Sequence, residues 1–319
     1  YYHLSTELLK GNFTSRTLSA GYTGIVAVLR WVTNDNIPVL LLIQALLLST
    51  VPIGVYLIAS HCFNNATALW AAGLAALSQL LLFNSVNLTR ESFGALFVVW
   101  LAYGFLRLQS QKKALPFLLL TTLLAIGSGV LVSIDNAWLP ILLLVMGGSI
   151  FFMNAKWLAR LAGAVFAGVL LISVLVGINH RLTGSSSLVG RSRGMAVDVW
   201  ISNNPYAKQL SAKGANLFGP PAEMLSNFFK EPVENSRLYA MKIAYDFGNY
   251  FLEGQAGNFD PVMMVPLSDW NANLNAYISL FGFFGFLAGF VYLLRQGKYW
   301  NAVVLASFTF VFFSMYIVL

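Results

Sequence analysis

The side chains that could do chemistry stand beside the apolar stretches of this chain or in one polar segment. Arg90 and Glu91 are neighbours at the start of an apolar stretch, and Asp135 lies between two others. A carboxylate can take the proton of an acceptor hydroxyl, and fixed cations can stabilise a departing phosphate. The candidate carboxylates are Glu7, Glu91, Asp135 and Asp198, and the candidate cations are Arg90, Arg181, Arg191, Arg193, Lys208 and Lys242. These residue types suit a group transfer in which a phosphate leaves.

Each of these candidates also has a purely structural interpretation. Glu91 would be stabilised at the start of a helix by the positive end of the helix dipole. Asp135 would cap the helix that follows it. Arg181, Arg191 and Arg193 would bind lipid headgroups as readily as a phosphate-bearing substrate. Both interpretations stay open at this stage.

Two further patterns are less specific. Asn203 and Asn204 precede Pro205, which is typical of a plain turn but would also present two amides to a substrate. His3 and His180 fall on the same predicted face and could flank a divalent metal, although they lack the paired spacing of a metal site. We therefore assign no metal ligand and no certain cofactor, and a divalent metal stays an open alternative.

The elements that must position these residues are apolar helices. The 319 residues are 58% hydrophobic and 10% charged, and the mean hydropathy is +0.70. A water-soluble fold of this composition would lack the polar side chains to cover its surface. Most of the windows without Asp, Glu, Lys or Arg reach the ~20 residues that a bilayer-spanning helix needs. These eight windows are residues 38–60, 66–89, 92–106, 114–134, 136–155, 161–179, 270–294 and 299–319.

The windows divide the chain into four parts. Residues 1–37 are an outer juxtamembrane segment, 38–179 hold six transmembrane helices, 180–269 form a loop domain, and 270–319 hold two more helices. We predict an all-α polytopic bundle of eight spans, with juxtamembrane helices and one extracytoplasmic insert at 180–269.

The orientation follows from Lys and Arg in the short connections, which favour the cytoplasmic side. If the chain begins outside, the outer short connections carry only Arg90, although Lys10, Arg16 and Arg30 in the first segment oppose the assignment. The inner connections carry Arg107, Lys112, Lys113, Lys156, Arg160, Arg295 and Lys298. Aromatic residues at span ends are typical of interface belts. They are Trp31, Trp138 and Trp270 at outer ends, and Trp157, Tyr299 and Trp300 at inner ends.

Several function classes are disfavoured. Ion-coupled transport needs ionisable groups near mid-bilayer, and the windows contain no Asp, Glu, Lys or Arg. The net charge of +7 is no sign of nucleic-acid binding, because the basic excess lies largely in the inner connections and the first outer segment. Cys62 is the single cysteine, so no internal disulfide forms. Because the chain starts at Tyr1 and stops inside an apolar span, we expect a fragment that lacks a preceding transmembrane helix.

Five segments resemble the polyprenyl-phosphate-dependent glycosyltransferases of the C-type (GT-C) fold, which include protein O-mannosyltransferases and lipid A aminoarabinose transferases. The segments 1–13 and 21–31 are similar to the juxtamembrane helices of the first outer loop of that family. Segment 51–77 resembles its helix, inner turn and helix, and segment 87–108 resembles its Thr-Glu turn, here Arg90-Glu91. Segment 197–207, with Asn203-Asn204-Pro205, is similar to a Gly-Asn-Asn-Pro element.

The resemblance implies transfer of a sugar from a polyprenyl phosphate to an outward-facing acceptor, in the bacterial inner membrane. It implies that the main catalytic acid precedes Tyr1, with Glu91 as the catalytic candidate in this chain. Substrate contacts would come from Arg90, Asp135, Arg181, Arg191, Arg193, Asn203, Asn204 and Lys242. The expected partners are the lipid-linked donor and membrane lipid, and not nucleic acid; other membrane subunits stay open. The alternative is a non-catalytic relative that serves as a scaffold or accessory subunit of a larger membrane complex.

Overall fold

The computed structural model describes residues 2–10, 20–111, 114–134, 138–152, 157–183, 282 and 284–318, and every regular element in these ranges is a helix. The chain forms two compact units, Tyr1–Arg191 with Gln296–Thr309, and Ser192–Arg295 with Phe310–Leu319. The described part thus has the predicted all-α class. Asp135, Arg191, Arg193, Asn203, Asn204 and Lys242 lie outside the described residues.

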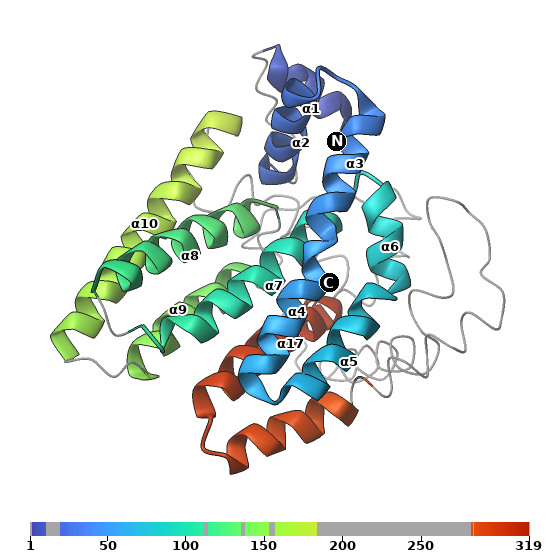
Figure 1. Cartoon of the computed structure of the whole chain (residues 1–319). Helices are drawn as coiled ribbons and strands as arrows, with labels where there is room; N and C mark the ends of the chain where they lie inside the picture. The colour runs from blue at the N-terminus through green and yellow to red at the C-terminus, as the bar shows by residue number, and fades with distance from the viewer. Residues whose placement is uncertain are drawn as a thin grey trace, which may run out of the picture. The chain divides into compact units, whose positions relative to one another are not determined.

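Figure 1 shows the helices that the structure describes. They are α1 (Tyr2–Leu9), α2 (Ala20–Val32), α3 (Ile37–Leu48), α4 (Thr50–Cys62), α5 (Asn65–Ala76), α6 (Gln79–Val86), α7 (Arg90–Leu108), α8 (Ala114–Ile134), α9 (Leu139–Phe152), α10 (Trp157–Thr183) and α17 (Tyr299–Val318). Residues 284–295 are also helical. Among the described residues, two helical stretches, Ile37–Cys62 and Leu115–Ile134, are long and apolar enough to cross a membrane. Eight separate spans stay a prediction.

Two windows that the sequence predicts as single spans each hold two helices. Window 38–60 contains α3 and α4, which follow one another in one column and meet at Ser49 (Figure 1). The Ser49 backbone keeps a helical conformation, so Ile37–Cys62 still forms a 26-residue stretch, about 39 Å long. Window 66–89 is more sharply divided, because the Ser78 side chain accepts a hydrogen bond from the backbone N–H of Leu81 and starts α6 anew.

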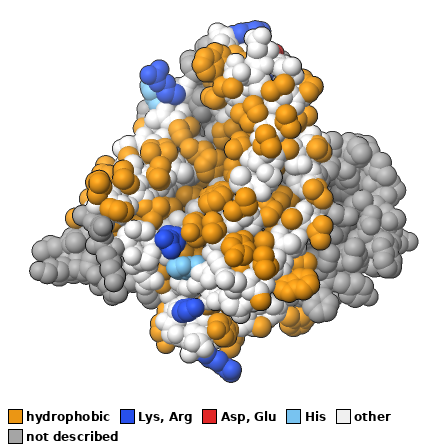
Figure 2. All heavy atoms as spheres, in the orientation of Figure 1, with side chains coloured by type: hydrophobic (Ala, Val, Ile, Leu, Met, Phe, Trp, Pro, Cys, Tyr) orange, Lys and Arg blue, Asp and Glu red, His pale blue; other side chains and the backbone are white. Residues whose placement is uncertain are grey.

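The Ile37–Cys62 stretch is apolar and yet mostly outside the protein core. Only 22% of its most apolar window is buried, and Leu42, Leu46 and Ile53 are each more than half exposed. Figure 2 shows hydrophobic side chains spread across the described face, with few charged side chains among them. The core helix of a water-soluble protein would bury these side chains, since each contributes about 1.5–3 kcal/mol on leaving water. The exposed face therefore suits contact with lipid.

One buried cluster of the first unit joins α2, α7 and α8. Tyr22 and Val26 of α2 form a buried cluster with Phe93 of α7 and Ile134 of α8, and the Tyr22 and Phe93 ring centroids lie 6.1 Å apart. Small residues allow these close approaches. A Cβ atom built on Gly21 would lie 1.9 Å from Ser133 Oγ, so only glycine fits α2 against α8.

Ends that the sequence places on the cytoplasmic side contact one another. Lys298 Nζ donates a hydrogen bond to the carbonyl oxygen of Cys62 at 3.0 Å, and Trp300 Nε1 donates to the carbonyl oxygen of Phe105 at 3.1 Å. The prediction of an interface belt is wrong for Trp300, which is 2% exposed, and for Trp138, whose ring packs 6.3 Å from that of Phe308. An indole N–H can be satisfied by a buried carbonyl as well as by the interface.

Cysteine labelling tests the predicted orientation directly. Gln109 is exposed just after α7, at a predicted inner end, whereas Ser211 belongs to the predicted outer insert and lies outside the described residues. In intact membranes we expect a cysteine at Gln109 to react only from the cytoplasmic side and one at Ser211 only from outside. Cys62 is buried, so the unsubstituted chain supplies the low-labelling control. Reaction of both positions from the same side would overturn the orientation.

Candidate functional site at the start of α7

A buried side chain of α3 organises the junction between α6 and α7. Gln44 is fully buried, and its Nε2 donates hydrogen bonds to the carbonyl oxygens of Asn84 at 2.8 Å and Asn87 at 2.7 Å. These carbonyls lie at and just beyond the end of α6, where no helical N–H group follows to bond them. One amide from a neighbouring helix therefore fixes the backbone that leads into α7.

Hydroxyl groups complete the same network. Thr89 Oγ1 donates to Asn84 Oδ1 at 2.8 Å and lies 3.0 Å from Ser92 Oγ, which donates to the Asn84 carbonyl oxygen at 2.7 Å. Because Thr89 uses its hydroxyl in this way, its side chain does not cap α7, although Thr89 occupies the N-cap position. This network fixes the start of α7. The Thr89 side chain accepts no hydrogen bond from the first backbone N–H groups of the helix.

Arg90 and Glu91 occupy the first two positions of α7. The pair therefore does open a helix, as the structural interpretation requires, and Arg90 is partly exposed there. The side chain of Glu91 lies outside the described part of the structure. A helix start presents a partial positive charge and backbone N–H groups, which together favour phosphate and carboxylate groups. Arg90 adds a positive charge at the same end and Glu91 a negative one, so the first turn offers backbone N–H groups, a cation and a carboxylate.

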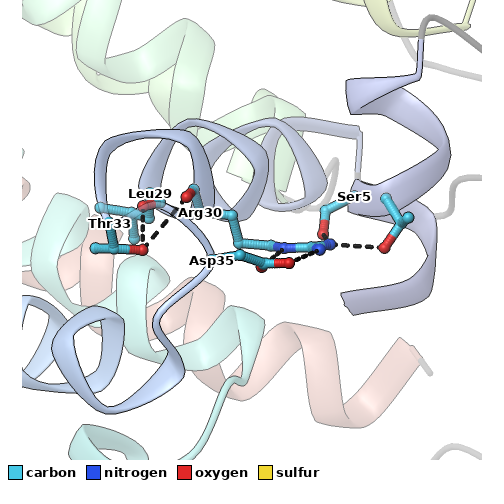
Figure 3. Close-up of polar contacts among 6 residues, drawn as sticks. Ser5, Leu29, Arg30, Thr33 and Asp35 are labelled. Atoms are coloured by element: carbon cyan, nitrogen blue, oxygen red, sulfur yellow. Dashed lines mark hydrogen bonds and ion pairs between the residues drawn. The ribbon is translucent and has the colours of Figure 1, made fainter.

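A second polar cluster ties α1 to the end of α2 (Figure 3). The Arg30 guanidinium donates through Nε and Nη2 to the two carboxylate oxygens of Asp35, at 2.6 and 2.9 Å, and through Nη1 to the hydroxyls of Ser5 and Thr6, both at 2.7 Å. Arg30 is 5% exposed, whereas the Asp35 side chain is 54% exposed. Such a two-point pair fixes orientation as well as charge.

The turn that delivers Asp35 is conformationally unusual. Asn34 and Asp35 have φ angles of 50° and 63°, in the left-handed region that few non-glycine residues adopt. In the sequence alone, Arg30 is an opposing topology signal and Asp35 does not stand out. The available signal was an arginine in the last turn of an apolar helix, with an aspartate five residues later.

The remaining predicted residues are placed only in part. His180 and Arg181 lie in the last turn of α10, and Arg181 is exposed. No hydrogen bond among the described residues joins Arg181 to the α6–α7 junction. The described ranges hold no group of three or more His, Cys, Asp or Glu side chains suited to a metal, and the side chain of His3 lies outside them. Convergence of Asp135, Arg191, Arg193 and the Asn203 turn on this junction stays a prediction.

The range that holds the α6–α7 junction and the Arg30–Asp35 pair matches a known protein family. Residues 23–181 match the family of dolichyl-phosphate-mannose-protein mannosyltransferases. The match begins inside α2, ends in the last turn of α10, and includes Arg30, Gln44 and the start of α7. It covers just under half of the chain. No curated protein and no solved structure matched this chain. The resemblance seen in the sequence therefore has support at the level of this family.

Proposed function

We propose that this protein is an integral membrane glycosyltransferase of the GT-C fold. It moves a sugar from a polyprenyl-phosphate donor to a protein, lipid or polysaccharide acceptor on the extracytoplasmic side of a bacterial inner membrane. The observation that carries the proposal is the match of residues 23–181 to a family of lipid-linked sugar transferases. The hydrogen-bonded start of α7, which carries Arg90 and Glu91, lies within the matched range and supports it.

The transfer requires a base, fixed positive charge for the phosphate and an apolar surface for the lipid, and this chain offers a candidate for each. The acceptor hydroxyl attacks the anomeric carbon, the bond from that carbon to the phosphate oxygen breaks, and the phosphate leaves with the electron pair. A carboxylate takes the hydroxyl proton. We assign that role in this chain to Glu91. Displacement with inversion needs only one base, so a second carboxylic acid is not required.

The departing phosphate needs fixed positive charge and the lipid chain needs an apolar surface. Arg90 and the N–H groups at the start of α7 would stabilise the phosphate, because they are already oriented before charge develops. Arg181, Arg191, Arg193 and Lys242 are further candidate cations, with Asp135, Asn203 and Asn204 as candidate sugar contacts. The exposed leucines of α3, on the helix that also carries Gln44, offer an apolar surface for the polyprenyl chain.

Donor specificity tests this proposal. Purified full-length protein should transfer sugar from a polyprenyl-phosphate donor and should ignore nucleotide sugars, because the sequence contains no dinucleotide-binding glycine pattern in a soluble segment. A panel of polyprenyl-linked sugars, each paired with its nucleotide sugar, gives the measurement. Turnover with a nucleotide sugar in the absence of lipid carrier would contradict the proposal. A folded protein that is inert with the whole panel would favour the non-catalytic scaffold.

A further inference from the structure

A group of basic side chains lies at the ends of three helices, at the predicted cytoplasmic side. His61 is in the last turn of α4, Arg107 is in the last turn of α7, and Lys298 directly precedes α17. The hydrogen bond from Lys298 Nζ to the Cys62 carbonyl oxygen, 3.0 Å long, brings the start of α17 against the end of α4. We call these three residues the α4–α7–α17 cluster.

Backbone contacts bring the third helix into the same group. Trp300 Nε1 donates to the carbonyl oxygen of Phe105, two residues before Arg107, at 3.1 Å. The end of α7 therefore lies beside the start of α17, and Lys298, which precedes α17, contacts the end of α4. In the view of Figure 2, Lys and Arg side chains lie on either side of a His side chain, with hydrophobic side chains around them.

Among the described side chains, no carboxylate balances the charge of the cluster. The two acidic side chains that the structure describes, Glu7 and Asp35, are paired elsewhere, with Lys10 and Arg30. Within the described residues, the Arg107 guanidinium has no hydrogen-bond or ion-pair partner, and Lys298 uses its ammonium group on a backbone carbonyl, a neutral acceptor. Arg107 and Lys298 are both exposed, so their positive charge faces the surroundings.

Exposed apolar side chains lie on the helices that pack against α4 and α7. On α5, which packs against α4, Leu69 and Trp70 are 66% and 77% exposed. On α8, which packs against α7, Leu115 and Leu119 are 66% and 56% exposed. A ligand that fits this surface therefore carries negative charge at one end and an apolar chain at the other.

We propose that the α4–α7–α17 cluster is a binding site for the headgroup of an anionic phospholipid, with the acyl chains along α5 and α8. A phosphodiester accepts hydrogen bonds from Arg107 and Lys298 while the exposed apolar side chains contact the acyl chains. Arg107 lies in the last turn of α7, whereas the proposed sugar-transfer site lies at its first turn. The lipid site is therefore separate from the proposed sugar transfer. Lipid bound there joins α4, α7 and α17 and thereby stabilises their packing.

Lipid retention tests this site. The full chain is reconstituted in nanodiscs of phosphatidylglycerol and phosphatidylcholine, transferred to mild detergent, and the lipids that stay bound are counted by native mass spectrometry. We expect retained phosphatidylglycerol to fall about fivefold in R107Q and further in R107Q/K298Q, because each basic residue near the surface contributes this order of affinity. Phosphatidylcholine retention should not change.

The controls separate the site from general charge and from folding. K10Q removes one positive charge that already has a carboxylate partner at 3.4 Å, and it should retain phosphatidylglycerol normally. R107Q alters a side chain without a polar partner among the described residues, so it should unfold at the wild-type temperature once stripped of lipid. Inorganic phosphate should not displace the lipid. Equal phosphatidylglycerol retention by wild type and R107Q/K298Q, or an equal loss in K10Q, would overturn the proposal.

Discussion

Replacing Glu91 by glutamine should lower sugar transfer tenfold or more, which corresponds to a barrier increase of at least about 1.4 kcal/mol. Glutamine keeps the size of the side chain but cannot accept the proton of the acceptor hydroxyl. The folded protein should persist, because a carboxylate at the start of a helix contributes only about 0.3–1 kcal/mol through the helix dipole. Transfer rates and thermal unfolding, measured on the same preparation, give the two readouts.

A variant of Arg90, the residue beside Glu91, tests donor binding separately from proton transfer. Arg90→Gln should weaken the productive binding of the donor phosphate and lower kcat/KM, since Arg90 adds charge at the first position of α7. Arg295→Gln removes an exposed arginine at a predicted inner helix end and is the matched control. Full activity in Glu91→Gln, with only a small loss of stability, would reduce Arg90-Glu91 to a helix start and the family match to a statement about fold.

Substituting Gly21 by alanine should destabilise the packing of α2 on α8. The new Cβ would lie 1.9 Å from Ser133 Oγ and 2.8 Å from the Ser133 carbonyl carbon, and real Cβ atoms essentially never show contacts below 3.0 Å. Rotation of the serine relieves the first contact but not the second, which involves backbone. Overpacking of this kind costs about 1–3 kcal/mol. Thermal unfolding in a single detergent should therefore show a lower midpoint.

A second glycine isolates the steric cause. A Cβ built on Gly73 of α5 meets nothing within 4 Å, so Gly73→Ala should be neutral or should stabilise the helix by up to about 1 kcal/mol. The two variants make the same chemical change inside a helix and differ only in the space available. If Gly21→Ala unfolds at the same temperature as Gly73→Ala, the close α2–α8 contact is wrong.

The sequence predicts the long apolar helices well, because a long stretch without charged residues indicates a helix that faces lipid. Window 114–134 and α8 have the same bounds, and window 38–60 differs from Ile37–Cys62 by at most two residues. The division at Ser78 is harder to foresee, because the serine is compatible with the interior of a helix and with its start. Only the hydrogen bond that Ser78 accepts from Leu81 decides between them.

The site is predictable only where it depends on local sequence. Arg90 opens α7 as expected, but Gln44 stands in the middle of an apolar run, and its partners Asn84 and Asn87 lie 40 and 43 residues away. A linear pattern carries no information on such a pairing. For the same reason Arg30 could be counted as an outer cation, although Ser5, twenty-five residues earlier, helps to bury it.

Photo-crosslinking of the donor lipid tests the central claim most directly. A polyprenyl phosphate that carries a diazirine next to the phosphate is irradiated with the purified full-length protein, and the adducts are mapped by peptide mass spectrometry. We expect adducts in residues 84–92, where α6 ends and α7 begins, that disappear when unlabelled polyprenyl phosphate is added in excess. Adducts that are confined to other helices, or that resist this competition, would contradict a donor site at the start of α7.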